Sequence, residues 1–144
     1  MGFISALSLV TSNTILADYI AGEEANKRGD RQTAFQEFYT AAQKGNARAY
    51  GKLGSMYLYG LGTKKDYHQA YIWFHMGYLS GERQAERFRD AASSTMAREE
   101  YLKAVESAEI ERVKQKLGTA PPQQMPPVSP KTPSAKARSA KDPS

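Results

Sequence analysis

Histidine is the residue type in this sequence that could hold a metal ion. The chain has two histidines, His68 and His75, which are seven residues apart and therefore about 10 Å apart along a helix. Metal ligands on one helix are usually four residues apart, and no acidic residue completes a helical cluster with this pair. We therefore expect both histidines at the surface or rim of the fold. We predict no metal ion and no cofactor.

Serine and glutamate residues could support hydrolytic chemistry, but their surroundings do not favour it. A serine nucleophile needs a positioned base and an oxyanion site, and neither Ser55 nor Ser80 lies in an elbow sequence. The glutamates occur in close pairs that are typical of solvated helix faces: Glu23/Glu24, Glu99/Glu100 and Glu106/Glu109. The sequence has no cysteine, which excludes thiol catalysis, disulfides and thiolate metal sites. It predicts a protein that is not an enzyme, with an envelope hydrolase or wall-active enzyme as the alternative.

A short glycine motif, Gly60-Leu-Gly62 followed by Lys64 and Lys65, could form a phosphate-binding loop. Such a loop requires a preceding strand and a third glycine, whereas the residues before Gly60 have the i, i+4, i+7 spacing of a helix. A turn between two helices explains the motif with fewer requirements. Gly60 would end one helix with a positive φ, Gly62 would give a second permissive position, and Asp66 would cap the next helix.

The elements that position these residues repeat along the chain. A shift of 36 residues aligns Phe38 with Phe74 and several flanking positions: Asp30 with Asp66, Ala34 with Ala70, Gly45 with Gly81, and Ala49 with Ala85. The aspartates are predicted to cap helices and the glycines to end them. We predict helices at about 18–28, 31–44, 47–59, 67–80, 82–93 and 97–117, with Asn46 capping the third. The fold class is therefore all-α, a short α-solenoid of antiparallel helix hairpins.

The helical part is predicted to span residues 18–117, with repeat units at about 18–45 and 46–81. Residues 82–117 do not continue the 36-residue pattern, and we expect them to form a C-terminal cap that closes the stack. The last helix is amphipathic, although Glu106 and Glu109 interrupt its apolar face. That face covers an arc of about 140°: Leu102, Val105, Ile110, Val113 and Leu117.

The two ends of the chain differ from its middle. Residues 1–17 are mostly apolar and are predicted to be a signal peptide or an N-terminal apolar helix, but they have no basic n-region. No stretch reaches the roughly 20 apolar residues of a membrane span. Residues 118–144 contain all seven prolines and are predicted to be a disordered tail with P-x-x-P spacings. This tail carries +3 of the net charge of +5, so no specific nucleic-acid binding is predicted. Weak binding of an anionic polymer through the tail is a second alternative function.

Residues 47–81 resemble one unit of the Sel-one-like repeat family, which is related to tetratricopeptide repeats. The matching positions have the spacing of that family: Ala49, Leu53, Gly54, Tyr57, Gly60, Gly62, Asp66, Ala70, Trp73, Phe74 and Gly81. The resemblance implies antiparallel helix pairs in a right-handed superhelix whose inner groove contacts other proteins. Gly77 and Tyr78 stand where the family usually has two alanines, so Tyr78 is predicted to alter the local packing. With its apolar leader, the sequence also resembles small exported bacterial members, which implies a periplasmic or secreted protein; a cytoplasmic one is the alternative.

Aromatic residues crowd residues 50–78, and most of them are expected in the core: Tyr57, Trp73 and Phe74. Tyr50 and Tyr59 are predicted to project from the helix that lines the groove. Together with Lys52 and Ser55 they form a hypothetical strip that binds another protein or a peptide. Because about two units make a short stack, we also expect a partner or a second copy of the chain to contribute to stability.

Overall fold

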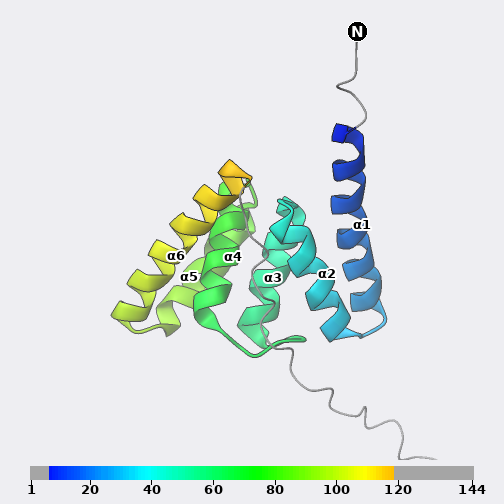
Figure 1. The fold of residues 1–144 in the computed structure, drawn as a ribbon. Helices are drawn as coiled ribbons and strands as arrows, with labels where there is room; N and C mark the ends of the chain where they lie inside the picture. The colour runs from blue at the N-terminus through cyan, green and yellow to red at the C-terminus, as the bar shows by residue number, and fades with distance from the viewer. Residues whose placement is uncertain (1–6, 119–144) are drawn as a thin grey trace, which may run out of the picture.

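The structure is a computed structural model that describes residues 7–118, with side chains from Thr14 onward. This part of the chain is helical and contains no strand. The helices are α1 (Leu7–Lys27), α2 (Arg31–Gln43), α3 (Ala47–Tyr59), α4 (Tyr67–Leu79), α5 (Arg83–Thr95) and α6 (Arg98–Leu117). Helices α1 to α4 each pack on the helix that follows them in the chain (Figure 1), which confirms the predicted all-α solenoid. None of the described helices is both long enough and apolar enough to cross a lipid bilayer.

Short polar side chains begin the central helices, as their positions in the sequence predict. The carboxylate of Asp30 accepts from the Thr33 N–H at 3.2 Å, and that of Asp66 accepts from the Gln69 N–H at 2.9 Å. Asn46 caps α3 in the same way. Each of these bonds satisfies a backbone donor that the first turn of a helix leaves without an intrahelical partner. The 36-residue pattern of caps is therefore confirmed.

The glycine motif forms a turn, and the described backbone has no strand leading into it. Gly60 ends α3 with φ of 69°, and its N–H donates to the carbonyl of Met56. Gly62 has φ of 73°, and a Cβ at this position would lie 2.0 Å from the carbonyl oxygen of Arg31. The loop therefore lies against the first turn of α2, in the preceding repeat. Only a residue without a Cβ permits this contact.

Aromatic rings fill the spaces between helices, and glycines on the facing helices make room for them. Phe38 of α2 packs over Gly22 of α1, and Phe74 of α4 packs over Gly54 of α3. At both glycines a Cβ would lie 2.7 Å from the ring. Both rings are buried, as are the predicted core residues Tyr57 and Trp73. The repeat thus uses an aromatic ring in its second helix and a glycine in its first.

The first helix differs from its predicted bounds. It begins at Leu7 and not at residue 18, and it runs without interruption to Lys27. The apolar stretch 7–17 is continuous with the first helix of the repeat stack. Residues 1–6 and residues 119–144 of the tail predicted at 118–144 lie outside the described residues. The ends of α2, α4, α5 and α6 differ from prediction by two residues or fewer.

The last helix packs with a face that the sequence pattern did not indicate. α6 lies on α4 and makes few contacts with α5. The residues that it buries are Ala104, Ala108 and Glu111. The small alanines let the two helix backbones approach closely, and Glu111 and Gln115 follow one and two turns later on the same face. The residues of the predicted apolar arc, from Leu102 to Leu117, are exposed, and the side of α6 that packs on α4 is its alanine side.

The prediction that Tyr78 alters the local packing is wrong, because Tyr78 is not buried. Its ring is more than one-third exposed, and the guanidinium of Arg89 lies over it at 5.0 Å from the ring centroid. The contact is made by Gly77, where a Cβ would lie 3.0 Å from the Glu82 carboxylate. Glycine in place of the family's alanine at position 77 therefore leaves room for the side chain of Glu82, the residue that precedes α5.

Candidate partner-binding surface

One face of α3 carries three of the four residues predicted to bind a partner. Lys52, Ser55 and Tyr59 are three and four residues apart and therefore lie on one side of the helix. Tyr59 is 58 % exposed, the largest exposed fraction of any described tyrosine. Arg48 lies one turn before Lys52 and is also exposed. Arg48 is not among the predicted partner-binding residues, although its i, i+4 spacing from Lys52 places it on this face.

Tyr50 does not belong to this surface, so its predicted position is wrong. It lies on the opposite side of α3 with Leu53 and Tyr57, and only 4 % of its surface is exposed. Its ring stacks on Trp73 with centroids 5.9 Å apart. Burial, together with the carboxylate of Glu111, raises the pKa of Tyr50 above its ordinary value. The i, i+3, i+7 spacing of these three residues is the core stripe of α3.

The polar groups of the exposed face are partly held by internal contacts. Lys52 Nζ lies 2.8 Å from Glu23 Oε1 of α1 and 6.0 Å from the centroid of the Phe38 ring. Ser55 Oγ donates to the carbonyl of Gly51 at 3.0 Å. The ion pair joins α3 to α1, the contact with Phe38 joins it to α2, and the serine bond lies within α3. They leave the aromatic ring of Tyr59 and the guanidinium of Arg48 as the groups most accessible to a partner. We call Arg48, Lys52, Ser55 and Tyr59 the α3 face.

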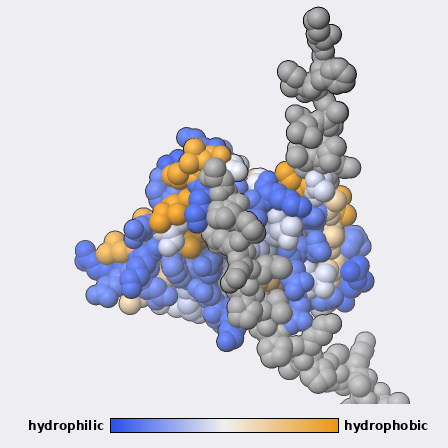
Figure 2. Space-filling view, viewed as in Figure 1, coloured by the Kyte–Doolittle hydropathy of each residue, from blue (hydrophilic) through white to orange (hydrophobic). Residues whose placement is uncertain are grey.

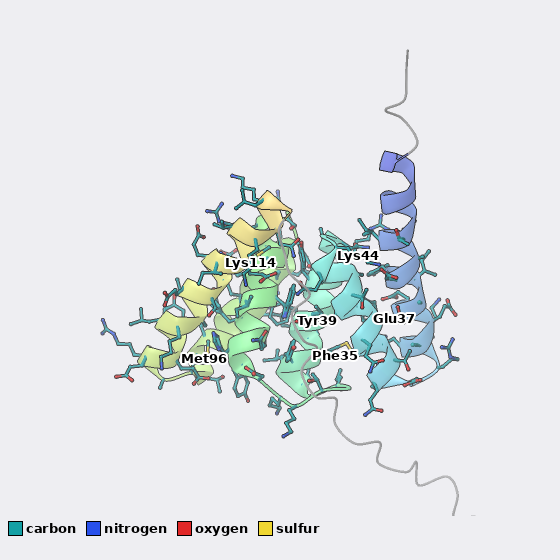
Figure 3. All side chains as sticks on the ribbon, in the orientation of Figure 1. Phe35, Glu37, Tyr39, Lys44, Met96 and Lys114 are labelled. Atoms are coloured by element: carbon teal, nitrogen blue, oxygen red, sulfur yellow. The ribbon has the colours of Figure 1, made fainter. Side chains whose placement is uncertain are left out.

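A second polar region lies between α2, α4 and α6. Tyr39 of α2 faces Trp73 of α4, with ring centroids 5.9 Å apart, and Figure 3 shows it beside the α4 ribbon. The carboxylate of Glu111 is buried next to it, and burial together with this charge raises the pKa of Tyr39. Gln115 Nε2 donates to the carbonyl of Ala42 at 3.3 Å. These polar contacts hold α6 against the end of α2.

A hollow of about 250 Å³ lies between α4 and α6 in this region. Its lining includes one buried carboxylate, Glu111, and one cation, Lys114, whose Nζ lies 3.9 Å from that carboxylate. The only hydroxyl in the lining belongs to Ser107, and no histidine accompanies it. A nucleophile with a general base would require such a pair within hydrogen-bond distance.

The histidines lie on α4 as part of its packing. His75 is half-buried and stacks on Tyr71, with ring centroids 5.9 Å apart. Burial, reinforced by the positive charge of Arg89, lowers the pKa of His75. Across residues 7–118 there is no cluster of three or more histidine, aspartate or glutamate side chains that could hold a metal ion. The rim position expected for the histidines agrees with their partial burial.

Two curated proteins share sequence similarity with this chain. One is an uncharacterized Sel1-like repeat-containing protein of Schizosaccharomyces pombe, which is 34 % identical over 80 residues. The other is the ERAD-associated E3 ubiquitin-protein ligase component HRD3A of Arabidopsis thaliana, which is 39 % identical over 69 residues. The matches cover 52 % and 43 % of this chain but only 12 % and 10 % of the relatives. The chain thus spans about one-tenth of the length of either relative.

These similarities confirm the predicted resemblance to Sel1-like repeats, the family named above as Sel-one-like. No family profile matches the chain. No solved structure matches it either. The resemblance therefore rests on the two relatives, on the repeat positions and on the stacked helices.

Proposed function

Because the chain resembles Sel1-like repeat proteins in sequence and in its stacked helices, we propose that it is a non-enzymatic adaptor. Its partner is another protein or a peptide, and the contact surface is the α3 face. The exposure of Tyr59 is the observation that carries this proposal. A tyrosine offers a large contact area with few rotatable bonds and a polar hydroxyl, which suits the centre of a protein interface.

The charges around Tyr59 define the chemistry of the partner. Arg48 is exposed on the same face, whereas the charge of Lys52 is balanced by an ion pair with Glu23. A partner segment with an aromatic or aliphatic side chain next to a carboxylate would pack on the tyrosine and pair with the arginine. Arginine and tyrosine are both enriched among residues that dominate interface energies. We therefore expect an acidic, partly apolar peptide segment.

Site-specific photocrosslinking tests this surface. A photoreactive phenylalanine analogue replaces Tyr59 in one variant and Tyr101, an exposed tyrosine of α6, in the matched control. We expect a discrete crosslinked product from position 59 and none of the same mass from position 101. The proteins in that product are then identified and purified for binding measurements.

The affinity of the purified partner provides the quantitative test. The Tyr59→Ala substitution should weaken binding by about tenfold or more, which is the effect of a typical interface hot spot. The Tyr101→Ala control should change the dissociation constant less than about twofold. If Tyr59→Ala binds like the wild type while its helical circular dichroism is unchanged, then the α3 face is not the binding surface.

An envelope location is a further part of this proposal, and its support is the apolar leader predicted at residues 1–17. The N-terminal residue of the protein isolated from cells tests it. A mature start after Ala17 would support export, whereas a protein that keeps the leader and fractionates with the cytoplasm would contradict it.

A further inference from the structure

Small and polar side chains hold α6 on the stack. The residues that it buries are Ala104, Ala108 and Glu111. Near its start, the ring of Tyr101 lies nearly perpendicular to the ring of Tyr71 of α4, with centroids 5.6 Å apart. The large apolar residues of α6 are exposed, and Figure 2 shows hydrophobic surface over its C-terminal end. Because hydrophobic stabilisation grows with the apolar area removed from water, two alanine methyl groups contribute little to the docking of this 20-residue helix.

Two hollows lie along the C-terminal half of α6, so the helix does not fill the space over α4. The first is the hollow of about 250 Å³ between α4 and α6, which Ile72 and Trp73 line from the α4 side. The second has a volume of about 450 Å³ and lies further along both helices, where Met76 of α4 and Gln115 of α6 line it. Side chains that border a gap lose the dispersion contacts of a close-packed interior. The packing of α6 on α4 is therefore loose beyond the two alanines.

Two buried polar groups add a cost to the docked position of α6. Glu111 is only 5 % exposed, and its carboxylate lies 3.3 Å from Gln115 Nε2 and 3.9 Å from Lys114 Nζ. Removal of a carboxylate from water has a desolvation cost that an apolar side chain of the same size does not have. The indole N–H of Trp73 is also buried, and it has no acceptor among the described residues. Both residues line the hollow between α4 and α6, so both gain access to water when α6 leaves α4.

The rest of the stack is held together without α6. α5 packs on α4 through larger side chains, and the rings of Phe88 and Phe74 stack with centroids 5.3 Å apart. Two residues, Met96 and Ala97, connect α5 to α6, and Met96 packs against the core. Elements with few buried apolar contacts open locally at a lower free energy than the whole domain. A motion of α6 about this connection would therefore leave α1 to α5 in place.

We propose that α6 is a lid that undocks from α4 as a unit while α1 to α5 stay folded. The surface that it covers is aromatic and includes residues of three helices. Trp73 of α4 contacts Tyr39 of α2 and Tyr50 of α3, with centroids 5.9 Å apart in both pairs, and all three side chains are at most 5 % exposed. Tyr50 borders the second hollow, and the carboxylate of Glu111 lies near Tyr39. The open lid presents this surface, which is separate from the α3 face, and the closed lid withholds it.

Engineered cysteines measure the opening, because the natural chain has none. Ala108→Cys on α6 and Ala92→Cys on α5 both replace a buried alanine, and each thiol reacts with a labelling reagent only when its helix opens. Ala108→Cys should react at least about a hundredfold faster than Ala92→Cys, which requires unfolding of the stack. Adding Glu111→Met, which replaces the buried carboxylate by an apolar side chain of similar size, should slow the labelling of Ala108→Cys at least about tenfold. Glu106→Met, at an exposed glutamate of the same helix, is the matched control and should leave the rate unchanged.

The fluorescence of Trp73, the only tryptophan of the chain, reports what the lid covers. Ala108→Asp should hold the lid open, because a charged side chain resists burial against α4, and should raise the acrylamide quenching of Trp73 at least about twofold. Val113→Asp, on the exposed side of α6, should leave the quenching unchanged. In hydrogen exchange of the wild-type full chain, amides in the middle of α6 should exchange at least about a hundredfold faster than those of α3 and α4. Equal exchange in the three helices would overturn the proposal, as would equal labelling of Ala108→Cys and Ala92→Cys, or labelling that Glu111→Met does not slow.

Discussion

Replacement of Gly62 by alanine tests whether the glycine motif is a structural turn that joins two repeats. Gly62 and Gly29 both have a positive φ, of 73° and 80°. A Cβ at Gly29 would meet no atom within 4 Å, whereas one at Gly62 would lie 2.0 Å from the carbonyl oxygen of Arg31 and 2.5 Å from its carbon. The two glycines share the backbone conformation and differ in the contact. A comparison of Gly29→Ala with Gly62→Ala therefore separates the cost of a positive φ from the cost of the overlap with Arg31.

The expected magnitudes follow from these distances. An alanine with positive φ costs about 1–2 kcal/mol, part of which is offset by about 0.4–1 kcal/mol because alanine restricts the unfolded chain. Gly29→Ala should thus lower the free energy of unfolding by about 1 kcal/mol. Gly62→Ala adds an overlap with backbone atoms that cannot rotate away, which costs about 1–3 kcal/mol more. We expect a total of about 2–4 kcal/mol and a fall in Tm of about 10 °C or more.

Urea unfolding followed by circular dichroism at 222 nm measures both variants, with Gly29→Ala as the control for backbone strain. Equal costs for the two substitutions would show that the loop does not lie on α2. The same assay tests the alternative function of the motif, because phosphate or a nucleotide that binds the folded chain would raise its stability. We expect inorganic phosphate at 10 mM to leave the wild-type unfolding midpoint unchanged relative to sulfate at matched ionic strength.

Three further substitutions test the packing and the charges. Gly54→Ala should destabilise the fold by about 1–3 kcal/mol, although alanine has the better helix propensity, because its Cβ would overlap the Phe74 ring. This loss of stability should be smaller in a Phe74→Leu background. An equal loss in both backgrounds of this double-mutant cycle would contradict the contact between the ring and the glycine. Because the folded state lowers the pKa of His75, its unfolded form binds protons more tightly, so acidification from pH 7.5 to 5.5 should lower the wild-type stability more than that of His75→Gln, measured by urea unfolding. Lys52→Gln should cost about 0.5–1 kcal/mol by removing the ion pair with Glu23, and a cost that does not shrink in 1 M NaCl would exclude an electrostatic origin.

Local chemistry made the helices and their ends predictable. Aspartate and asparagine accept backbone hydrogen bonds wherever a helix begins, and glycine ends a helix because it adopts a positive φ without strain. These effects act within a few residues. For this reason the caps at Asp30, Asn46 and Asp66 and the turn at Gly60 agree with the structure. The core positions of Tyr57 and Trp73 followed from the 3.6-residue period.

Which face of each helix is buried depends on contacts between segments that are distant in the sequence. The period of α6 shows that the helix has an apolar arc, but only its docking on α4 shows that the alanine side is buried and that Leu117 faces outward. Tyr50 is likewise of a residue type that is common in interfaces. Its ring is in the core because it stacks on Trp73, which lies 23 residues further along the chain. Period fixes which residues share a face of a helix. Which face is buried depends on what the neighbouring helix presents, and that is a property of the packed structure alone.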